Sequence, residues 1–259
     1  MNPWDAYVYV GIGSLLLSGA GIYAAYRGAK ITSYVTLLSA LLLHLGFIVY
    51  LWVVGGRPPL RTLGETRMLY SFFVLLLGGV LYYRSGYWWV LLCSSVLSGV
   101  FAVLNVLRPE IHSQELMPAL QSVLFVPHVL SYMFAYGVLG VALLYGAVGA
   151  MRRGLPITHA IETERLVRLG LGFLMVGLLL GALWAKEAWG TYWRWDPKET
   201  WAGITVLSYL LYLHHHRFHP RGERMSLVLQ LVGFLCLQMC WYGVNYLPWA
   251  GESLHTYGQ

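Results

Sequence analysis

Charged residues and cysteines are both scarce in this 259-residue sequence. Charged residues make up 11% of the chain, whereas a soluble domain carries about 25%. The three cysteines form no CxxC pair and lie in apolar runs, which favours buried small side chains over a redox or metal site. An HExxH motif and a recognisable Ser-His-Asp arrangement are also missing. These absences argue against a soluble domain, a thiol-based site and the common hydrolase sites.

Long apolar stretches make up most of the chain, since 58% of its residues are hydrophobic and its mean hydropathy is +0.60. A helix needs roughly 20 apolar residues to cross a bilayer. Runs near this length cover residues 7–26, 33–54, 68–83, 87–107, 128–151, 168–188, 200–216 and 226–248. The predicted fold class is therefore all-α, a polytopic integral membrane bundle of about eight transmembrane helices. Because no polar stretch is long enough for a soluble domain, residues 1–259 are predicted to form a single transmembrane domain.

The basic residues predict the orientation of this bundle. Ten of the 17 lysines and arginines lie in one alternating set of breaks between the runs, and the other seven lie in the opposite set. Because cytoplasmic loops carry the excess of positive charge, both termini are predicted to be extracytoplasmic. The first run lacks a basic n-region and a cleavage site, so it is interpreted as a retained helix. The net charge of +6 is then a topology signal, and no nucleic-acid partner is expected.

The segment WGTYWRWDPKETW, residues 189–201, interrupts the apolar runs on the predicted outer side. Part of it has a local explanation. Asp196 as N-cap, Pro197 at the first helical position and Glu199 at the third are expected to form a capping box that opens the seventh helix. Tryptophans also concentrate at membrane interfaces, where an amphipathic ring suits the headgroup level.

The density of aromatic rings in this segment exceeds what an interfacial belt needs. Trp189 and Trp193 would share a face if the stretch is helical, and Lys186 is one of the cations interleaved with the rings. A flat apolar ligand with anionic edges, such as haem, would need rings for its face and cations for its carboxylates. The predicted haem platform comprises Trp189, Tyr192, Trp193, Trp195, Asp196 and Trp201. The candidate contacts for the haem propionates are Arg194 and Lys198.

Four of the nine histidines stand apart from the rest. His128 and His255 lie on the same predicted side as the tryptophan segment, so they are the predicted axial ligands of a haem iron. His44 falls at membrane depth, where a titratable side chain is costly, and His214 falls near the cytoplasmic end of its run. Packing within the bundle for His44 and headgroup contact for His214 remain open as alternatives. Three histidines of polar loops are expected to be solvated, namely His112, His159 and His219.

Several segments resemble a known family. WGTYWRWDPKETW resembles the WWD motif of haem-handling cytochrome c assembly proteins, in the CcsA (ResC) branch of System II. MPALQSVLFVPHV resembles the family segment that carries the first external histidine, here His128, and LHTYG resembles the segment that carries the second, here His255. YLH resembles the segment of the transmembrane histidine, here His214, although His215 and His216 leave that register open.

A fourth segment is a looser match. GRPPLRTLGET resembles the family's GHAPLSNLYES region, with Thr62 and Gly64 in place of its usual Asn and Tyr. Together the four segments extend the resemblance over most of the chain, and it is strongest from residue 117 onward.

The resemblance implies a function in cytochrome c assembly. In this family haem passes from the cytoplasmic side to the WWD platform outside, and the thiols of a CxxCH segment of apocytochrome c add to its vinyl groups. The resemblance thus implies a haem-handling domain with its motif at residues 184–201, haem b as substrate, and a CcsB (ResB)-type membrane partner. The chain would be a holocytochrome c synthase (haem lyase) subunit of a bacterial inner membrane or a thylakoid-like equivalent. No catalytic residue separate from the haem site is expected.

Two other functions remain open. A carrier of the CcmC type would hand haem to a chaperone without forming the thioether bond. A quinol-linked cytochrome b would place paired histidines within the membrane, whereas here only His44 lies deep in a run. Co-purification distinguishes the synthase from the carrier, because a CcsB-like partner supports the synthase and a CcmE-like chaperone supports the carrier.

Overall fold

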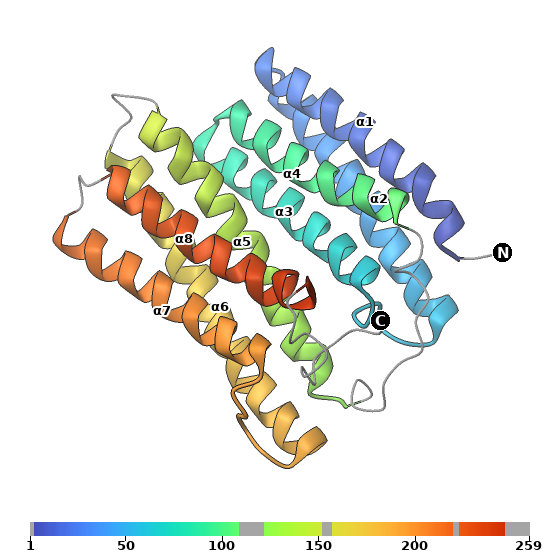
Figure 1. The fold of residues 1–259 in the computed structure, drawn as a ribbon. Coiled ribbons are helices and arrows are strands. Elements are labelled where there is room, and N and C mark those ends of the chain that lie inside the picture. Colours follow the sequence, from blue (N-terminus) through green and yellow to red (C-terminus); the bar gives the residue numbers. More distant parts are fainter. Residues whose placement is uncertain (1–2, 109–121, 152–156, 220–222, 247–259) are drawn as a thin grey trace. The chain divides into compact units, whose positions relative to one another are not determined.

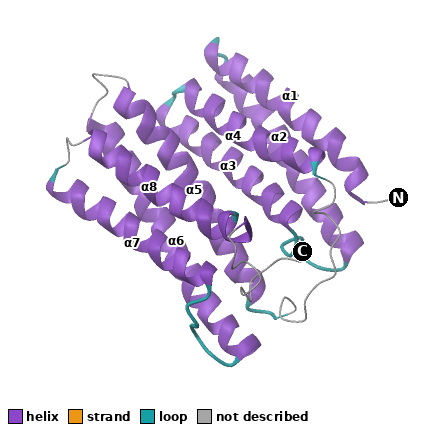
Figure 2. Cartoon of the chain, viewed as in Figure 1, coloured by secondary structure: helices purple, strands orange, loops and turns teal. Residues whose placement is uncertain are grey.

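The structure, a computed structural model, describes residues 3–108, 122–151, 157–219 and 223–246. Regular structure in these ranges is entirely helical, as Figure 2 shows. The eight α-helices, labelled in Figure 1, are α1 (Tyr7–Tyr26), α2 (Lys30–Gly55), α3 (Leu63–Ser85), α4 (Trp88–Leu107), α5 (Phe125–Met151), α6 (Ile157–Trp189), α7 (Pro197–Phe218) and α8 (Glu223–Trp241). The all-α prediction is confirmed. Helices suit a lipid environment because they satisfy their backbone polar groups internally.

Seven of these helices are long and apolar enough to cross a membrane. The exception is α7, whose sequence PKETWAGITVLSYLLYLHHHRF carries three consecutive histidines and several hydroxyl side chains that lower its hydropathy. The prediction of a polytopic membrane bundle is confirmed by length and composition. The side of the membrane on which each terminus lies stays a prediction.

The largest difference from the predicted boundaries concerns α6. This helix begins at Ile157 rather than at residue 168, so the segment ETERLVR, interpreted as part of a break, is helical. Side chains one turn apart stabilise this extension, because Arg165 contacts Glu162 at 3.2 Å and Arg168 contacts Glu164 at 2.6 Å. The hydropathy pattern missed these turns because a helix can carry charged side chains on one face. Such charges lower the mean hydropathy of the segment but do not end the helix.

The early start of α6 also corrects the expectation for His159. This histidine is buried, with its Nε2 atom 2.8 Å from the carbonyl oxygen of Tyr145. Its imidazole stacks on the ring of Tyr145 at 3.9 Å between ring centroids. The prediction of a solvated loop imidazole at His159 was wrong, because residues 157–168 are helical and pack on α5.

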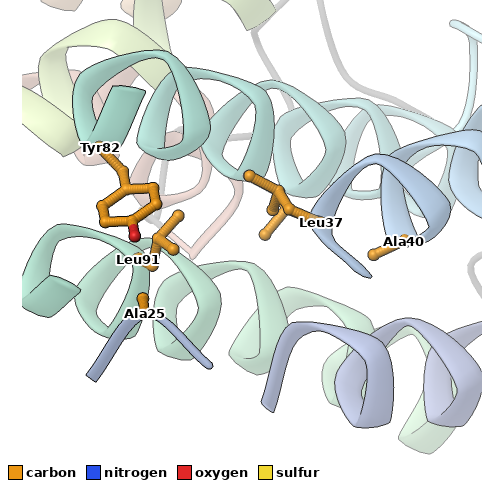
Figure 3. Packing of buried hydrophobic residues seen from close by; sticks show 6 residues of the cluster. Ala25, Leu37, Ala40, Tyr82 and Leu91 are labelled. Carbon is orange, nitrogen blue, oxygen red and sulfur yellow. The ribbon is translucent and has the colours of Figure 1, made fainter. Parts of the chain in front are cut away.

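The chain divides into two compact units, Met1–Glu115 and Leu116–Gln259. In the first unit α1 packs against α2 and α4, and α3 packs against α4. Side chains from all four helices meet in a buried apolar cluster, of which Figure 3 labels Ala25 of α1, Leu37 and Ala40 of α2, Tyr82 of α3 and Leu91 of α4. In the second unit α5 packs against α6 and α8, and α7 packs against α6 and α8. The prediction of a single domain over residues 1–259 stays a prediction.

The turn between α2 and α3 is organised by the carboxylate of Glu65. This buried group accepts two hydrogen bonds from the Arg57 guanidinium, at 3.0 and 3.2 Å, and one from the backbone N–H of Arg61 at 2.7 Å. It also accepts from the N–H of Thr62, whose hydroxyl accepts from the Glu65 N–H in return. Thr62 is therefore the N-cap of α3, a role that Asn also fills well. Because Thr and Asn both serve as N-caps, this role accounts for Thr62 at the position where the resembling family segment has Asn.

Small residues let α3 and α4 approach closely. A Cβ atom added at Gly78 of α3 would lie 2.3 Å from the Cβ of Ser94 on α4. The hydroxyl of Ser71 lies 2.6 Å from the hydroxyl of Ser98 and donates to the Ser98 carbonyl at 3.0 Å. Such contacts between small and hydroxyl side chains hold membrane helices together, since lipid supplies little hydrophobic drive for helix association.

The contact at Gly78 generates a prediction about stability. The substitution Gly78→Ala is expected to destabilise the protein by about 1–3 kcal/mol, because the new methyl group overlaps Ser94. The thermal midpoint of the detergent-solubilised protein measures this loss. Adding Ser94→Gly to the Gly78→Ala protein should restore most of the lost stability. The control is Gly46→Ala on the exposed face of α2, where an added Cβ atom meets no other atom within 4 Å. A Gly78→Ala protein as stable as the Gly46→Ala protein would contradict the close packing.

Candidate functional site

The tryptophan-rich segment forms a non-helical break between α6 and α7. Helix α6 ends at Trp189, and Gly190, with φ of 80°, donates its N–H to the Lys186 carbonyl at 3.0 Å. Regular helix resumes at Pro197. Trp189 and Trp193 therefore do not share a helix face, and the helical premise for that pairing was wrong. Glycine stops the helix here because it enters the left-handed region without steric cost.

The predicted capping box at the start of α7 is confirmed. The buried Asp196 side chain accepts a hydrogen bond from the Lys198 N–H at 2.8 Å, and Pro197 occupies the first turn. The Glu199 carboxylate accepts from the Asp196 N–H at 3.2 Å and from the Arg194 N–H at 2.7 Å. One carboxylate thus fixes both the start of the helix and the end of the break.

Two of the cations in this region hold the break in shape. The Lys186 ammonium donates to the Gly190 carbonyl at 2.8 Å and lies 5.4 Å from the ring centroid of Tyr192. The Arg194 guanidinium donates to the Thr191 hydroxyl at 2.8 Å and to the Trp189 carbonyl at 3.2 Å. These contacts were missed by sequence reasoning, which assigned the cations only to a ligand. The half-buried Lys198 and the exposed Arg194 keep their propionate roles as predictions.

The break exposes part of its aromatic surface. The side chain of Trp195 is 75% exposed and that of Tyr192 is 55% exposed, whereas Trp189, Trp193 and Trp201 are half-buried. The rings of Trp193 and Trp195 meet edge to face, with centroids 5.8 Å apart. Trp195 also has a φ of 61°, a left-handed conformation that costs a bulky residue about 1–3 kcal/mol. The local structure therefore holds an exposed tryptophan in a strained conformation.

His128 lies in the first turn of α5 and faces α6. Its Nδ1 atom is 2.8 Å from the carbonyl oxygen of Gly177. Its ring stacks on the buried Trp184 at 5.6 Å between centroids, and Trp184 contacts Trp189 edge to face at 4.8 Å. A carbonyl oxygen only accepts, so Nδ1 carries a proton, and when the imidazole is neutral its lone pair lies on Nε2. The second unit therefore links His128 to the first tryptophan of the motif.

Trp184 has a role that sequence reasoning missed. It was included at the start of the motif region 184–201 without a function of its own. In the structure it is the ring between His128 and Trp189, and Phe125 packs against it at 5.2 Å. Its position on α6, three residues after Gly181 and seven after Gly177, was the available signal, because these spacings place the three residues on one helix face.

The other predicted iron ligand, His255, lies outside the described residues, and so does His112. His44 lies on α2 in the first unit, is 1% exposed, and has its Nδ1 atom 3.0 Å from the hydroxyl of Ser14 on α1. Its Nε2 atom has no hydrogen-bond partner in the described part of the chain. His44 is thus packed within its bundle, as its alternative interpretation expected, and its role in haem uptake stays a prediction.

The three consecutive histidines of α7 point in different directions. His214 is exposed and contacts Phe218, with ring centroids 4.9 Å apart. His216 is buried, stacks near Tyr212 at 5.8 Å, and has its Nε2 atom 3.9 Å from the carboxylate of Glu164 on α6. His215 is half-buried and stacks on the exposed His219. Of the three positions that the sequence left open, only His216 has a buried imidazole.

Comparison with known proteins places this site in context. One segment of the chain is 48% identical over 95 residues to the cytochrome c biogenesis protein CcsA of Atropa belladonna. Similar segments are 47% identical to CcsA of Nicotiana tomentosiformis over 94 residues and 46% identical to CcsA of Oenothera argillicola over 97 residues. These matches cover 36–37% of this chain and 29% of each relative. They confirm the resemblance to CcsA that the tryptophan motif predicted.

The fold and the family extend further than these segments. The solved structure of the cytochrome c heme lyase CcmF matches 93% of this chain and 46% of its own, with a TM-score of 0.71 and 18% sequence identity. At this identity the likeness shows the fold alone. The family model of the cytochrome c assembly protein matches residues 37–250. Because this match spans most of the sequence, the chain belongs to the cytochrome c assembly protein family.

Proposed function

We propose that the chain brings haem b to the outer face of the membrane and promotes its thioether attachment to the CxxCH segment of apocytochrome c. The observation that carries this proposal is the contact of His128 with Trp184, which in turn contacts Trp189 of the motif. An imidazole at the end of an aromatic cluster combines an iron ligand with flat apolar surface. A CcsB-type membrane subunit is the proposed partner, by the resemblance to CcsA.

The described residues fit haem by the chemistry of their donors. His128 keeps its Nδ1 proton on the Gly177 carbonyl, so the lone pair suited to iron lies on Nε2. The exposed rings of Trp195 and Tyr192 offer surface to a porphyrin face. When bound, haem supplies the iron and the vinyl groups at which the thioether bonds form. His128 and His255 are the proposed axial ligands, and the six platform residues with Arg194 and Lys198 are the proposed surroundings.

The protein's own contribution is binding and orientation. Two reactants held in a productive geometry react faster because the entropy of their encounter has already been lost. The capping box of Asp196 and Glu199 and the contacts of Lys186 and Arg194 stabilise one conformation of the break, which suits this role. No separate nucleophile or base is required of the chain, so we propose a haem lyase subunit without a catalytic residue of its own.

A haem carrier of the CcmC type is the alternative function. It would use the same axial ligands and platform but release haem to a chaperone. Reconstitution of the purified chain with a CcsB-type subunit, haem and a CxxCH peptide separates the two functions. Covalent haem on the peptide supports the lyase, and haem that stays extractable from the peptide supports the carrier.

The histidines of α7 and α2 are proposed to take part in haem uptake from the cytoplasmic side. A helix from Pro197 to His214 rises about 26 Å, close to the hydrocarbon thickness, so His214 and the break lie at opposite ends of α7. Of the candidates at that end, burial beside Glu164 favours His216 over His214. His44 is the proposed second histidine of the uptake path.

The axial ligands generate the main prediction of the proposed function. His128→Ala and His255→Ala are each expected to lower the haem content of the purified protein, because each removes one ligand of the iron. Added imidazole should partly restore a bis-imidazole absorption spectrum by filling the vacant coordination position. His219→Ala, at an exposed position beyond α7, is the control. Unchanged haem spectra in both ligand variants would remove this assignment.

The capping box generates a second prediction. Asp196→Asn should be tolerated much better than Asp196→Ala, because Asn keeps an oxygen that caps α7 and loss of an N-cap costs about 1 kcal/mol. Cytochrome c assembly and the amount of folded protein in the membrane are measured side by side. If both variants are inactive at a normal protein level, Asp196 acts directly on the haem or its substrate and not through the cap.

Uptake generates a third prediction. His216→Ala is expected to leave the external site without haem although His128 is intact, and haem added from outside should restore occupancy. His214→Ala serves as the matched comparison, because His214 lies two residues earlier on the exposed face of the same helix. Loss in His214→Ala alone would assign uptake to the exposed histidine. Normal occupancy in a variant that lacks His44, His214 and His216 together would leave packing between helices as the role of His44 and His216, and headgroup contact as the role of His214.

A further inference from the structure

Two glycines of α6 lie under two aromatic side chains of α5. A Cβ atom added at Gly181 would lie 2.6 Å from Cε1 and 2.7 Å from Nδ1 of His128. One added at Gly177 would lie 2.8 Å from the ring of Tyr132. Real Cβ contacts are not this short, so any side chain at either position would push a ring away. Glycine at 177 and 181 therefore sets the distance between α5 and α6 at the level of His128.

The close approach also determines the hydrogen bonding of His128. With its ring against the Gly181 Cα atom, the imidazole reaches the Gly177 carbonyl at 2.8 Å and stacks on Trp184. A ring displaced by a methyl group at position 181 would lose its place against both neighbours. The carbonyl of a helix residue cannot move to follow a displaced ring. The imidazole therefore keeps this hydrogen bond only if the space beside Gly181 stays open.

We propose that Gly177 and Gly181 are positioning residues for His128: the Gly177 carbonyl holds the proton on Nδ1, and Gly181 leaves the space in which the ring presents Nε2 to the haem iron. The inference rests on the proposed function in one respect, that His128 ligates iron. The tautomer and the seating of the ring belong to the haem-free protein and can be measured without it.

The expected consequence follows from the chemistry of metal-bound histidines. A carbonyl that accepts the second N–H of a ligating imidazole fixes its tautomer and raises its basicity, and loss of such a partner weakens metal binding about 10- to 100-fold. Gly181→Ala keeps the His128 side chain but displaces its ring from the Gly177 carbonyl, which removes this support. The haem affinity of Gly181→Ala should therefore be about 10- to 100-fold weaker than that of the wild type.

The test compares Gly181→Ala with Gly172→Ala, a matched control on the same helix where an added Cβ meets no atom within 4 Å. Haem affinity is measured by titrating haem into each purified protein, with and without imidazole. The tautomer of His128 is measured in the haem-free proteins by nitrogen NMR of isotope-labelled histidine, with the signal assigned by its loss in His128→Ala. The expected result is an Nδ1–H tautomer in the wild type and in Gly172→Ala, a mixture of tautomers in Gly181→Ala, and weaker haem binding only in Gly181→Ala, partly restored by imidazole.

The double variant His128→Ala/Gly181→Ala separates positioning from general damage to the fold. Without the imidazole the new methyl group has room, so Gly181→Ala should have no further effect on haem affinity or folded yield in the His128→Ala protein. An equal loss in both backgrounds would overturn the proposal, and so would a wild-type His128 that carries its proton on Nε2. If His128→Ala binds haem as the wild type does, the axial assignment is wrong instead, while the NMR result still decides the seating of the ring.

Discussion

The carboxylate of Glu199 is the group on which the candidate site depends most. It accepts hydrogen bonds from the N–H groups of Arg194 and Asp196, two donors that no helix satisfies because they lie in the break between α6 and α7. Unsatisfied backbone groups are costly, and more so near lipid. With these donors paired, the chain can leave one helix, expose Trp195 and begin the next within seven residues, 190–196.

The charges of the break serve its structure before they serve any ligand. Lys186 and Arg194 each donate to a carbonyl at the end of α6, Gly190 and Trp189 respectively. Positive side chains at the C-terminal end of a helix also interact favourably with its dipole. A cation held in this way is pre-ordered for an anionic ligand, since little side-chain entropy remains to be lost on binding. Arg194 can therefore hold the break and also serve as one of the proposed propionate contacts.

The packing of α5 on α6 connects this break to the interior of the second unit. His128, Trp184 and Trp189 form a continuous series of ring contacts from α5 to the first residue of the motif. At the other end of the unit, His216 and His159 are buried among polar groups of neighbouring helices, including Glu164 and the Tyr145 carbonyl. Imidazoles thus lie towards both ends of the same four helices, half-buried at His128 and buried at His159 and His216. This arrangement suits the proposed uptake of haem at one end and its proposed presentation at the other.

The sequence by itself determined the features that depend on residues close together in the chain. Hydropathy over about 20 residues gave the helices, and the order Asp196, Pro197, Glu199 gave the cap of α7, because hydrogen bonds of a helix end reach only a few residues. The tryptophan motif likewise identified the family from a local pattern.

Only the tertiary structure decided which side chains of different helices meet. The pattern of α7 could not separate His214 from His216, because the choice depends on which face α6 covers. The role of Trp184 and the position of the His128 ring depend on how closely α5 and α6 approach. Gly181 allows this close approach, and it lies 53 positions after His128 in the chain. Side-chain contacts between helices depend on helix rotation and spacing, and many residues far apart in the sequence fix these together.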